Sequence, residues 1–362
     1  MNDETRDWKP ATKLVHGGTL RSGFGETSEA IFLTQGFVYD SAEAAEARFK
    51  GEDDGFIYSR YANPTVDMFE KRMCLLEGAE DARATASGMA AVSAALLCSV
   101  KAGDHVVAAR ALFGSCRWVV EKLLPQYGVE ATLVDGTRME AWEQAIRPNT
   151  KLFFFESPTN PTLEVIDVAA VSALARSIGA RVVIDNVFAT PLFQKPLELG
   201  AHVVVYSATK HIDGQGRAMG GLILGRKDLI EAARLSAPPR GGTIGRGMKV
   251  NKEEILGMYV ALEKYINTDH DKEWKSWEDK VFLIAEAVKK VGNISTDVSV
   301  PPIANHTPFL EIAWDPNYIR ITRPQLQEKL RAGNPSIEVI GGKEHAISLT
   351  VFMLRPGEEK IV

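Results

Sequence analysis

A lysine that directly follows a predicted buried strand is the first feature of this chain that points to chemistry. Residues 203–206 read Val-Val-Val-Tyr and are followed by Ser207, Ala208, Thr209 and Lys210. Apolar β-branched runs are typical of buried strands, so the two hydroxyls and the amine are expected at a strand end. An amine held there can form a Schiff base with a carbonyl compound. A lone lysine in this position is more commonly a solvated loop residue, so a second observation is required.

A carboxylate provides that observation. The apolar run at 182–184 ends on Asp185, 25 residues before the lysine. Pyridoxal phosphate enzymes need a Schiff-base amine, groups that bind phosphate and an acid that pairs with the pyridinium nitrogen. A buried aspartate keeps that nitrogen protonated by charge pairing. An Asp-Asn pair after a strand can also be a simple turn, but Asp185 together with Lys210 predicts pyridoxal 5'-phosphate as the cofactor.

Two further motifs fit the same cofactor. Ser87, Gly88 and Met89 open an alanine-rich segment that is predicted to be a helix. Backbone N–H groups at a helix start can bind phosphate, and a glycine permits close approach; taken alone, the serine would be an ordinary N-cap. Phe113 is an aromatic near a predicted strand end and is suited to stack on a pyridine ring. Phe113 could instead be an aromatic residue of the hydrophobic core.

Helices and strands alternate over the region that carries these motifs. Strands are predicted from short apolar runs at 105–109, 132–134, 152–155, 182–184, 203–206 and 222–224, and helices at 66–76 and 88–100. This alternation predicts an α/β fold with a mostly parallel sheet covered on both faces. Ligands of such sheets bind at the carboxyl ends of the strands, where Glu156, Asp185 and residues 207–210 fall.

The chain is predicted to have three parts. Residues 1–55 lack sustained periodicity and are expected to form an N-terminal arm, and residues 56–235 a large cofactor-binding domain. A smaller α+β domain is predicted for residues 236–362, and a Pro-Pro-Arg-Gly-Gly cluster at 238–242 lies near its start. Its predicted elements are helices at 252–266 and 271–291 and strands at 309–313 and 346–353.

Composition narrows the function classes. The 362 residues are 45% hydrophobic and 25% charged, as in ordinary soluble proteins. A net charge of −5 without a basic block disfavours nucleic acid and anionic membranes as partners. No apolar run is long enough to span a membrane, and the histidine spacing predicts no metal site. Three scattered cysteines and an acidic, polar start indicate a cytoplasmic protein that acts on a small molecule.

Five motifs in order resemble the fold-type I pyridoxal phosphate enzymes of cysteine and methionine metabolism. The resemblance covers about residues 10–225, and residues 210–221 are most similar to the homoserine-ester sulfhydrylases that act on O-succinylhomoserine. It implies a mostly parallel seven-stranded sheet with helices on both faces and a smaller α+β C-terminal domain. The motifs are Y-S-R-Y-A-N-P-T at 58–65, S-G-M-A at 87–90, E-S-P-T-N-P at 156–161, D-N at 185–186 and S-A-T-K at 207–210.

The resemblance implies a role for each residue of the site within one subunit. Lys210 would hold the cofactor as a Schiff base and move protons at Cα and Cβ of the substrate. Asp185 would pair with the pyridinium, and Phe113, where relatives often have tyrosine, would stack on the ring. The phosphate would be bound by Ser87, Gly88, Met89, Ser207 and Thr209.

Further roles implied by the resemblance involve a second subunit and the substrate. Tyr58 and Arg60 would reach the phosphate of the neighbouring subunit, Arg60 through a charge-assisted fork. The protein would therefore be a homodimer or homotetramer with shared sites. Asn160 would orient the cofactor hydroxyl and the substrate carboxylate.

The C-terminal third departs from the family pattern. The usual family segment with a carboxylate-binding arginine is not found after about residue 225, and residues 243–255 and 353–358 resemble selenocysteine-synthase-like proteins of fold type I. The chain is therefore interpreted as a chimera of two families or as a divergent relative. Arg355, after a predicted strand, is the candidate for the substrate carboxylate, with Arg246 second. Alternatively, Arg355 is a solvent-exposed arginine in a turn and binds no substrate.

Three functions remain open on this basis. The first is γ-replacement on an activated homoserine ester, O-succinylhomoserine or similar, with sulfide or a thiol. The second is β- or γ-elimination, which the motifs do not separate from replacement. The third is a protein that binds pyridoxal phosphate with little or no turnover.

Overall fold

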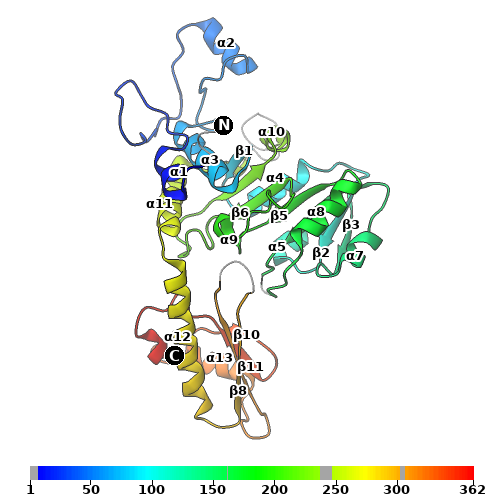
Figure 1. Cartoon of the computed structure of the whole chain (residues 1–362), viewed down its shortest axis with the longest axis vertical. Coiled ribbons are helices and arrows are strands. Elements are labelled where there is room, and N and C mark those ends of the chain that lie inside the picture. Colours follow the sequence, from blue (N-terminus) through cyan, green and yellow to red (C-terminus); the bar gives the residue numbers. More distant parts are fainter. Residues whose placement is uncertain (1–6, 161, 237–246, 302–305) are drawn as a thin grey trace. The chain divides into compact units, whose positions relative to one another are not determined.

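The computed structural model describes residues 7–160, 162–236, 247–301 and 306–362. The chain divides into two compact units, Met1–Asn267 and Thr268–Val362. The first unit contains a seven-stranded sheet between layers of helices (Figure 1). The second contains a separate four-stranded sheet with one long helix.

The sheet of the first unit is mostly parallel. Its strand order is β1-β7-β6-β5-β4-β2-β3, and the neighbouring pairs from β6 to β3 are all parallel, while β7 runs antiparallel to both of its neighbours. The apolar runs of the sequence form strands of this sheet, as predicted, and all of these except β3 are largely buried. The strands are β1 (Asp81–Thr85), β2 (His105–Ala109), β3 (Glu130–Val134), β4 (Thr150–Glu156), β5 (Arg181–Asp185), β6 (Val203–Ser207) and β7 (Gly221–Gly225).

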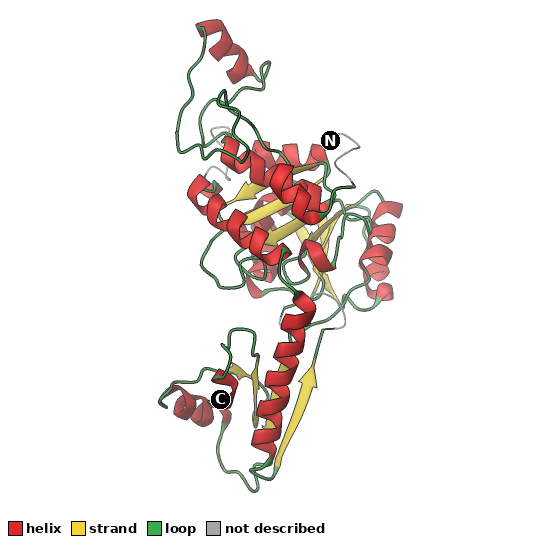
Figure 2. Cartoon of the chain, turned by 60° about the vertical axis from the view of Figure 1, so that its left-hand side comes forward, coloured by secondary structure: helices red, strands yellow, loops and turns green. Residues whose placement is uncertain are grey.

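Helices pack on both faces of this sheet (Figure 2). Side chains of α4 and α10 belong to one core cluster, those of α7 and α8 to another, and those of α3 and α11 to a third. Bounds of the helices are α1 (Pro10–His16), α2 (Ala42–Lys50), α3 (Pro64–Glu77), α4 (Gly88–Leu97), α5 (Gly114–Trp118) with a π-helical turn (Val119–Leu123), α6 (Leu124–Gln126), α7 (Met139–Gln144), α8 (Val168–Ser177), α9 (Thr190–Phe193), α10 (Lys227–Ser236) and α11 (Lys252–Ile266).

The segment before α3 is anchored by one buried arginine. Both η nitrogens of Arg72 lie 3.1 Å from the carboxylate oxygens of Glu29, and its Nε donates to the carbonyl of Gly17 at 3.0 Å. The guanidinium also lies 4.6 Å from the ring centroid of Tyr259 on α11. A buried cation requires such partners. The ion pair therefore ties the N-terminal segment to α3.

The second unit is a smaller α+β domain. Its sheet is antiparallel in the order β10-β11-β9-β8, and α12 packs Val281, Ile284 and Ala285 into the core beside it. Its elements are α12 (His270–Lys289), β8 (Ile294–Ser299), β9 (Phe309–Trp314), α13 (Arg323–Arg331), β10 (Ile340–Gly341), β11 (Ala346–Leu349) and a 3-10 turn (Glu358–Lys360).

The structure differs from the predictions in three places. The compact units divide after Asn267, not at residue 236, because Met258 and Leu262 of α11 are buried in one core cluster with α3. Strand β11 ends at Leu349 rather than residue 353. Strand β1, which was not predicted, is rich in alanine and buries Arg83, so it lacks the β-branched pattern of its neighbours.

Candidate active site

The carboxyl ends of adjacent parallel strands gather the chemical groups of the first unit. Glu156 ends β4, Asp185 ends β5 and Ser207 ends β6. The parallel register places Glu156 directly opposite Asp185. This edge of a parallel sheet is where α/β folds bind their ligands.

A close approach of backbone to strand forms the predicted phosphate site. A Cβ atom on Gly88 would lie 2.4 Å from Cβ of Ser207, so only glycine lets the start of α4 lie against the end of β6. The hydroxyl of Ser87 caps this helix by accepting from the N–H of Ala90 at 3.1 Å. The N–H groups of the first helical turn have no acceptor within the helix, and so they can bind an anion.

The lysine follows in a tight turn at the same edge. The N–H of Lys210 donates to the carbonyl of Ser207 at 3.1 Å, and the hydroxyl of Thr209 accepts from the N–H of Gly220 at 3.2 Å. The Lys210 side chain is exposed and accessible to a ligand. The adjacent His211 is partly buried, and burial lowers its pKa to about 4, so it adds no charge next to the amine at neutral pH.

Two acids at this edge are buried. Burial raises the pKa of Asp185, and burial together with the negative charge of Asp185 raises the pKa of Glu156 further. Glu156 therefore holds the proton at neutral pH, and Asp185 carries the single negative charge. Oδ1 of Asp185 accepts from the N–H of Val187 at 3.1 Å, and the thiol sulfur of Cys116 lies 3.8 Å from Oδ2.

Glu156 and Cys116 connect residues that the sequence analysis treated separately. Oε2 of Glu156 accepts from the N–H of Phe113 at 3.2 Å, and Cys116 Sγ lies 3.8 Å from the sulfur of Met89. Phe113 is partly exposed at the start of α5, so its ring is not in the core. The sequence analysis gave neither Glu156 nor Cys116 a role. An acid that ends an apolar run was the available signal for Glu156.

The structure thus brings most of the predicted residues together. Contacts that run in part through Cys116 and Glu156 connect eight of the predicted residues around one strand edge: Ser87, Gly88, Met89, Phe113, Asp185, Ser207, Thr209 and Lys210. The backbone of Asn160 adjoins the Glu156 carboxyl, while its side chain is exposed.

The remaining predicted residues lie in other segments. Arg60 lies over the rings of Tyr58 and Tyr61, at 5.6 and 4.9 Å from their centroids, in the segment before α3. Arg355 is in the second unit, exposed in a turn where its N–H donates to Glu358 at 2.8 Å. Arg246 lies outside the described residues.

These residues fit pyridoxal phosphate. Asp185 is 5% exposed, and no ion pair to it is recorded among the residues that the structure describes. A pyridinium would supply the missing positive charge. The start of α4 suits a phosphate, and Lys210 is positioned to react with a carbonyl group.

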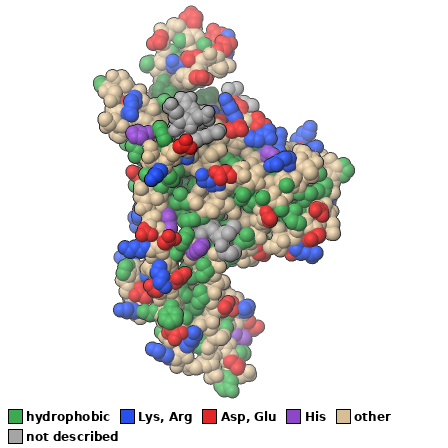
Figure 3. Space-filling model, in the orientation of Figure 1, with side chains coloured by type: hydrophobic (Ala, Val, Ile, Leu, Met, Phe, Trp, Pro, Cys, Tyr) green, Lys and Arg blue, Asp and Glu red, His purple; other side chains and the backbone are tan. Residues whose placement is uncertain are grey.

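Other classes of site are not found in the described part of the chain. It contains no group of three or more acidic, histidine or cysteine side chains placed to hold a metal ion. None of its helices is long and apolar enough to cross a membrane. Side chains of both charges are interspersed over the face shown in Figure 3.

Comparisons with curated proteins agree with this site. The chain is 56% identical over 221 residues to an O-succinylhomoserine sulfhydrylase of Mycobacterium tuberculosis (strain CDC 1551 / Oshkosh), covering 61% of the chain and 54% of that relative. It is 42% identical over 250 residues to an L-methionine gamma-lyase of Porphyromonas gingivalis, covering 66% and 63%. The chain therefore spans little more than half the length of these curated relatives.

Solved structures extend the similarity of the fold. A putative O-acetylhomoserine (thiol)-lyase from Campylobacter jejuni, solved with N'-pyridoxyl-lysine-5'-monophosphate, superposes with a TM-score of 0.72 at 24% identity over 85% of each chain. The structure of metB from Corynebacterium glutamicum gives 0.71 at 28% identity, covering 86% of this chain and 80% of that one. Both confirm the predicted fold class.

A family model settles the classification. The model described as Cys/Met metabolism PLP-dependent enzyme matches residues 11–249, the region that holds every strand of the large sheet and the whole site around Lys210. The chain belongs to the Cys/Met metabolism family of PLP-dependent enzymes.

Proposed function

We propose that the protein catalyses γ-replacement on an activated homoserine ester, O-succinylhomoserine or a similar ester, with sulfide or a thiol as the nucleophile. The observation that carries the proposal is the placement of Lys210 beside Ser207 and of Asp185 on the adjacent parallel strand. Its support in sequence is the 56% identity over 221 residues to an O-succinylhomoserine sulfhydrylase. The methionine gamma-lyase relatives favour elimination as the second candidate.

Lys210 moves the protons of this reaction. Pyridoxal phosphate, when bound, withdraws electrons from the bonds at Cα of an amino acid. Loss of an acyl group from Cγ then requires that a proton leaves Cα and a second leaves Cβ. A single flexible lysine amine reaches both carbons in turn and returns the protons later. The exposed side chain of Lys210 has this freedom.

Asp185 supplies one negative charge of fixed position. The N–H of Val187 and the thiol of Cys116 hold its two oxygens. Glu156, which keeps its proton, adds no second charge. The pair therefore matches a single positive charge at the pyridine nitrogen. Phe113, whose N–H donates to Glu156, would stack on the ring of the bound cofactor.

The site is proposed to be shared between two copies of the chain. The N-terminal segment leaves Phe24 and Val38 exposed at 95% and 92%, which supports burial against a second subunit. Tyr58 and Arg60 follow in the same segment and would reach the phosphate in that subunit. Mixing an Arg60→Ala variant with a Lys210→Ala variant should restore activity if sites are shared, and should restore none if each chain is self-contained.

The substrate carboxylate is proposed to bind Arg355 and Asn160. An arginine fork suits a carboxylate better than lysine does. Arg355→Ala should weaken binding of amino acids at least tenfold and leave pyridoxal phosphate binding unchanged. Arg320→Ala, an exposed arginine of the same unit, is the control. Equal amino-acid affinity of the parent and Arg355→Ala would exclude Arg355.

One assay separates the candidate functions. The protein is incubated with O-succinylhomoserine with and without sulfide, and homocysteine, 2-oxo acid and ammonia are measured. We expect homocysteine in the presence of sulfide. Equal yields of 2-oxo acid and ammonia with or without sulfide would instead identify a lyase, and binding of pyridoxal phosphate without any product would overturn both.

The cellular compartment also belongs to this proposal. Cys74, Cys98 and Cys116 are all free thiols, and two of them are buried. Free cysteines are usual in a reducing environment, which supports a cytoplasmic enzyme.

A further inference from the structure

A small pocket in the first unit is lined by positive charge. It lies between the segment before α3 and the start of α11, and its cationic side chains are Arg60, Lys249 and Lys252. The other described residues that line it are polar or apolar, and none is a carboxylate. A pocket with this lining favours an anionic ligand.

Lys252 is the strongest indication of a ligand. Its side chain is 6% exposed, and its one recorded ionic contact is with Glu253 at 3.4 Å, whose own side chain is 61% exposed. A buried ammonium with so distant and solvated a partner is costly. An anion in the pocket would give Lys252 a second partner that is shielded from solvent.

The helix that starts at Lys252 adds to this effect. The side chain of its N-cap, Asn251, makes no capping hydrogen bond. The N–H groups of the first turn therefore have no side-chain cap from that residue, and the positive end of the helix dipole faces the same region. The helix has 15 residues, so this contribution is that of a full-length helix.

The pocket adjoins the predicted phosphate site of the same unit, where the start of α4 lies against the end of β6; this site is called the phosphate cradle below. The N–H of Ala86, which precedes Ser87, donates to the carbonyl of Met248 at 2.9 Å. On the other side, the N–H of Met219 donates to Glu254 at 3.1 Å, directly before the glycine that contacts Thr209. Lys249 and Lys252 are thus held next to the segments that form the cradle.

We propose that Lys249 and Lys252, together with Arg60, form a second oxyanion site that binds a phosphate group. The phosphate can come from pyridoxal phosphate bound in a second copy of the chain, in which case the inference rests on the proposed function and adds two lysines to Arg60. It can equally come from inorganic phosphate. The chemistry of recognition is the same for both sources.

The experiment compares three variants of the full chain. Lys249→Met and Lys252→Met each remove one charge of the pocket, and Lys227→Met removes an exposed charge at the start of α10 as a control. Affinity is measured for pyridoxal phosphate, for pyridoxal and for inorganic phosphate. Lys249 is exposed, so its replacement tests the pocket even if replacement of the buried Lys252 prevents folding.

Each source of phosphate gives its own result. For the cofactor phosphate, both pocket variants should bind pyridoxal phosphate about tenfold more weakly and pyridoxal unchanged. If the ligand is free phosphate, the holoenzyme should bind inorganic phosphate. The same two variants should then bind inorganic phosphate about tenfold more weakly and bind pyridoxal phosphate as the parent does. Lys227→Met should match the parent throughout.

The unfolding temperature provides a second readout. Lys252→Met should unfold at the same or a higher temperature than the parent in phosphate-free buffer, because an apolar side chain replaces a poorly paired buried charge. Parent-like affinity of both pocket variants for pyridoxal phosphate and inorganic phosphate would overturn the proposal. A parent that binds phosphate through these lysines but no pyridoxal phosphate would overturn the proposed function and leave the pocket standing.

Discussion

The two units of the chain differ in where they place ionisable groups. In the first, Glu156 and Asp185 end buried parallel strands and their pKa values are raised. In the second, Asp297 and Glu311 face each other across an antiparallel pair, with Asp297 exposed to solvent. Parallel strands end at one shared edge, so the first sheet concentrates its acids, whereas the antiparallel sheet sends alternate strand ends to opposite edges.

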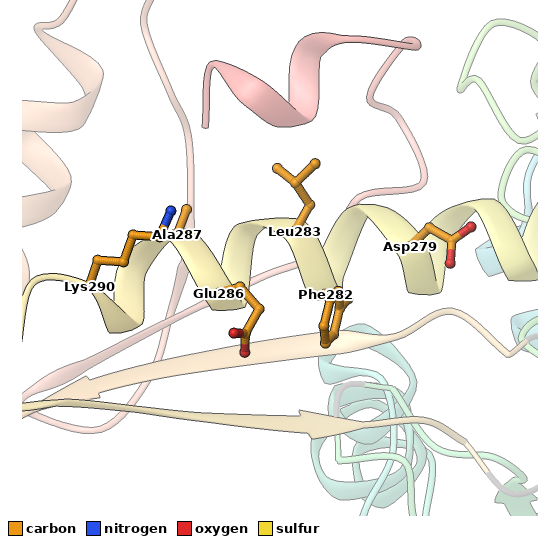
Figure 4. Close-up of a pocket in the computed structure, with 6 residues that line it drawn as sticks. All are labelled: Asp279, Phe282, Leu283, Glu286, Ala287 and Lys290. Atoms are coloured by element: carbon orange, nitrogen blue, oxygen red, sulfur yellow. The ribbon is translucent and has the colours of Figure 1, made fainter.

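The long helix α12 of the second unit also has charged side chains, but they do not converge on one point as the acids of the first unit do. A shallow pocket on α12 is lined by Asp279, Phe282, Leu283, Glu286 and Lys290, with Phe282 68% exposed. Figure 4 shows these side chains projecting in different directions from the helix. Charges of both signs that do not converge offer no single ligand chemistry. The difference shows that a pocket needs converging groups of related chemistry before it indicates a site.

The largest expected difference between the units concerns catalysis. Asp185→Ala should lower kcat/KM about 10²–10⁴-fold, because a lost buried charge pair costs about 3–5 kcal/mol. Asp297→Ala, the matched change on β8, should leave kcat/KM within about twofold. Steady-state kinetics with O-succinylhomoserine measure both. Equal kinetics of the Asp185→Ala variant and the parent would mean that the carboxylate is only a turn residue.

A second difference concerns stability. Arg72→Met leaves Glu29 without its buried partner and should lower the free energy of unfolding by about 3–5 kcal/mol. Arg331→Met in the second unit breaks an exposed pair with Glu338 and should cost about 0–1 kcal/mol. Urea unfolding checks both values. Similar losses for the two variants would contradict the anchoring role of Arg72.

The smallest effect is a pH dependence that only the first unit should show. Burial raises the pKa of Glu77 to about 8, and one of its oxygens has no hydrogen-bond partner while the other accepts from Tyr206 at 2.6 Å. The pKa of Glu77 is higher in the folded protein than in the unfolded chain. The stability that the protonated Glu77 contributes is therefore fully present below about pH 4.5 and is lost as the pH rises through about 8.

Replacing the carboxyl by an amide should remove that dependence. Relative to the parent, Glu77→Gln should become more stable as the pH rises from about 4.5 to about 8. Glu286→Gln, an exposed glutamate of α12, should follow the parent curve. Unfolding free energies across this pH range measure the effect, and parallel curves for the parent and Glu77→Gln would show that Glu77 is ionised in the folded state.

The sequence predicted six of the seven strands of the large sheet because each of these contains a short apolar run, whereas the alanine-rich β1 was missed. It also predicted Lys210, Asp185 and Ser207, since residues that end such runs lie at one edge of a parallel sheet. Glu156 ends an apolar run, which marks it as a strand-end acid, but its pairing with Asp185 depends on the register between strands. The contact of Cys116 with Asp185 depends on packing from α5, which no local pattern encodes. The pairing of Arg72 with Glu29 joins residues that are distant in sequence.

The C-terminal third was less predictable for a physical reason. The family match ends at residue 249, and the strands beyond it alternate buried and exposed residues or are as short as β10. The exposed turn of Arg355 carries no pattern that assigns a ligand. Its role, and the chimeric or divergent origin of this part, stay predictions.

The central claim is that the strand edge of the first unit holds pyridoxal phosphate on Lys210. The most direct test is to reduce the purified holoenzyme with borohydride, digest it and locate the pyridoxyl group by peptide mass spectrometry. We predict one modified peptide, with the group on Lys210, and no modification in the Lys210→Ala variant. A pyridoxyl group on another lysine, or undiminished modification of Lys210→Ala, would contradict the account.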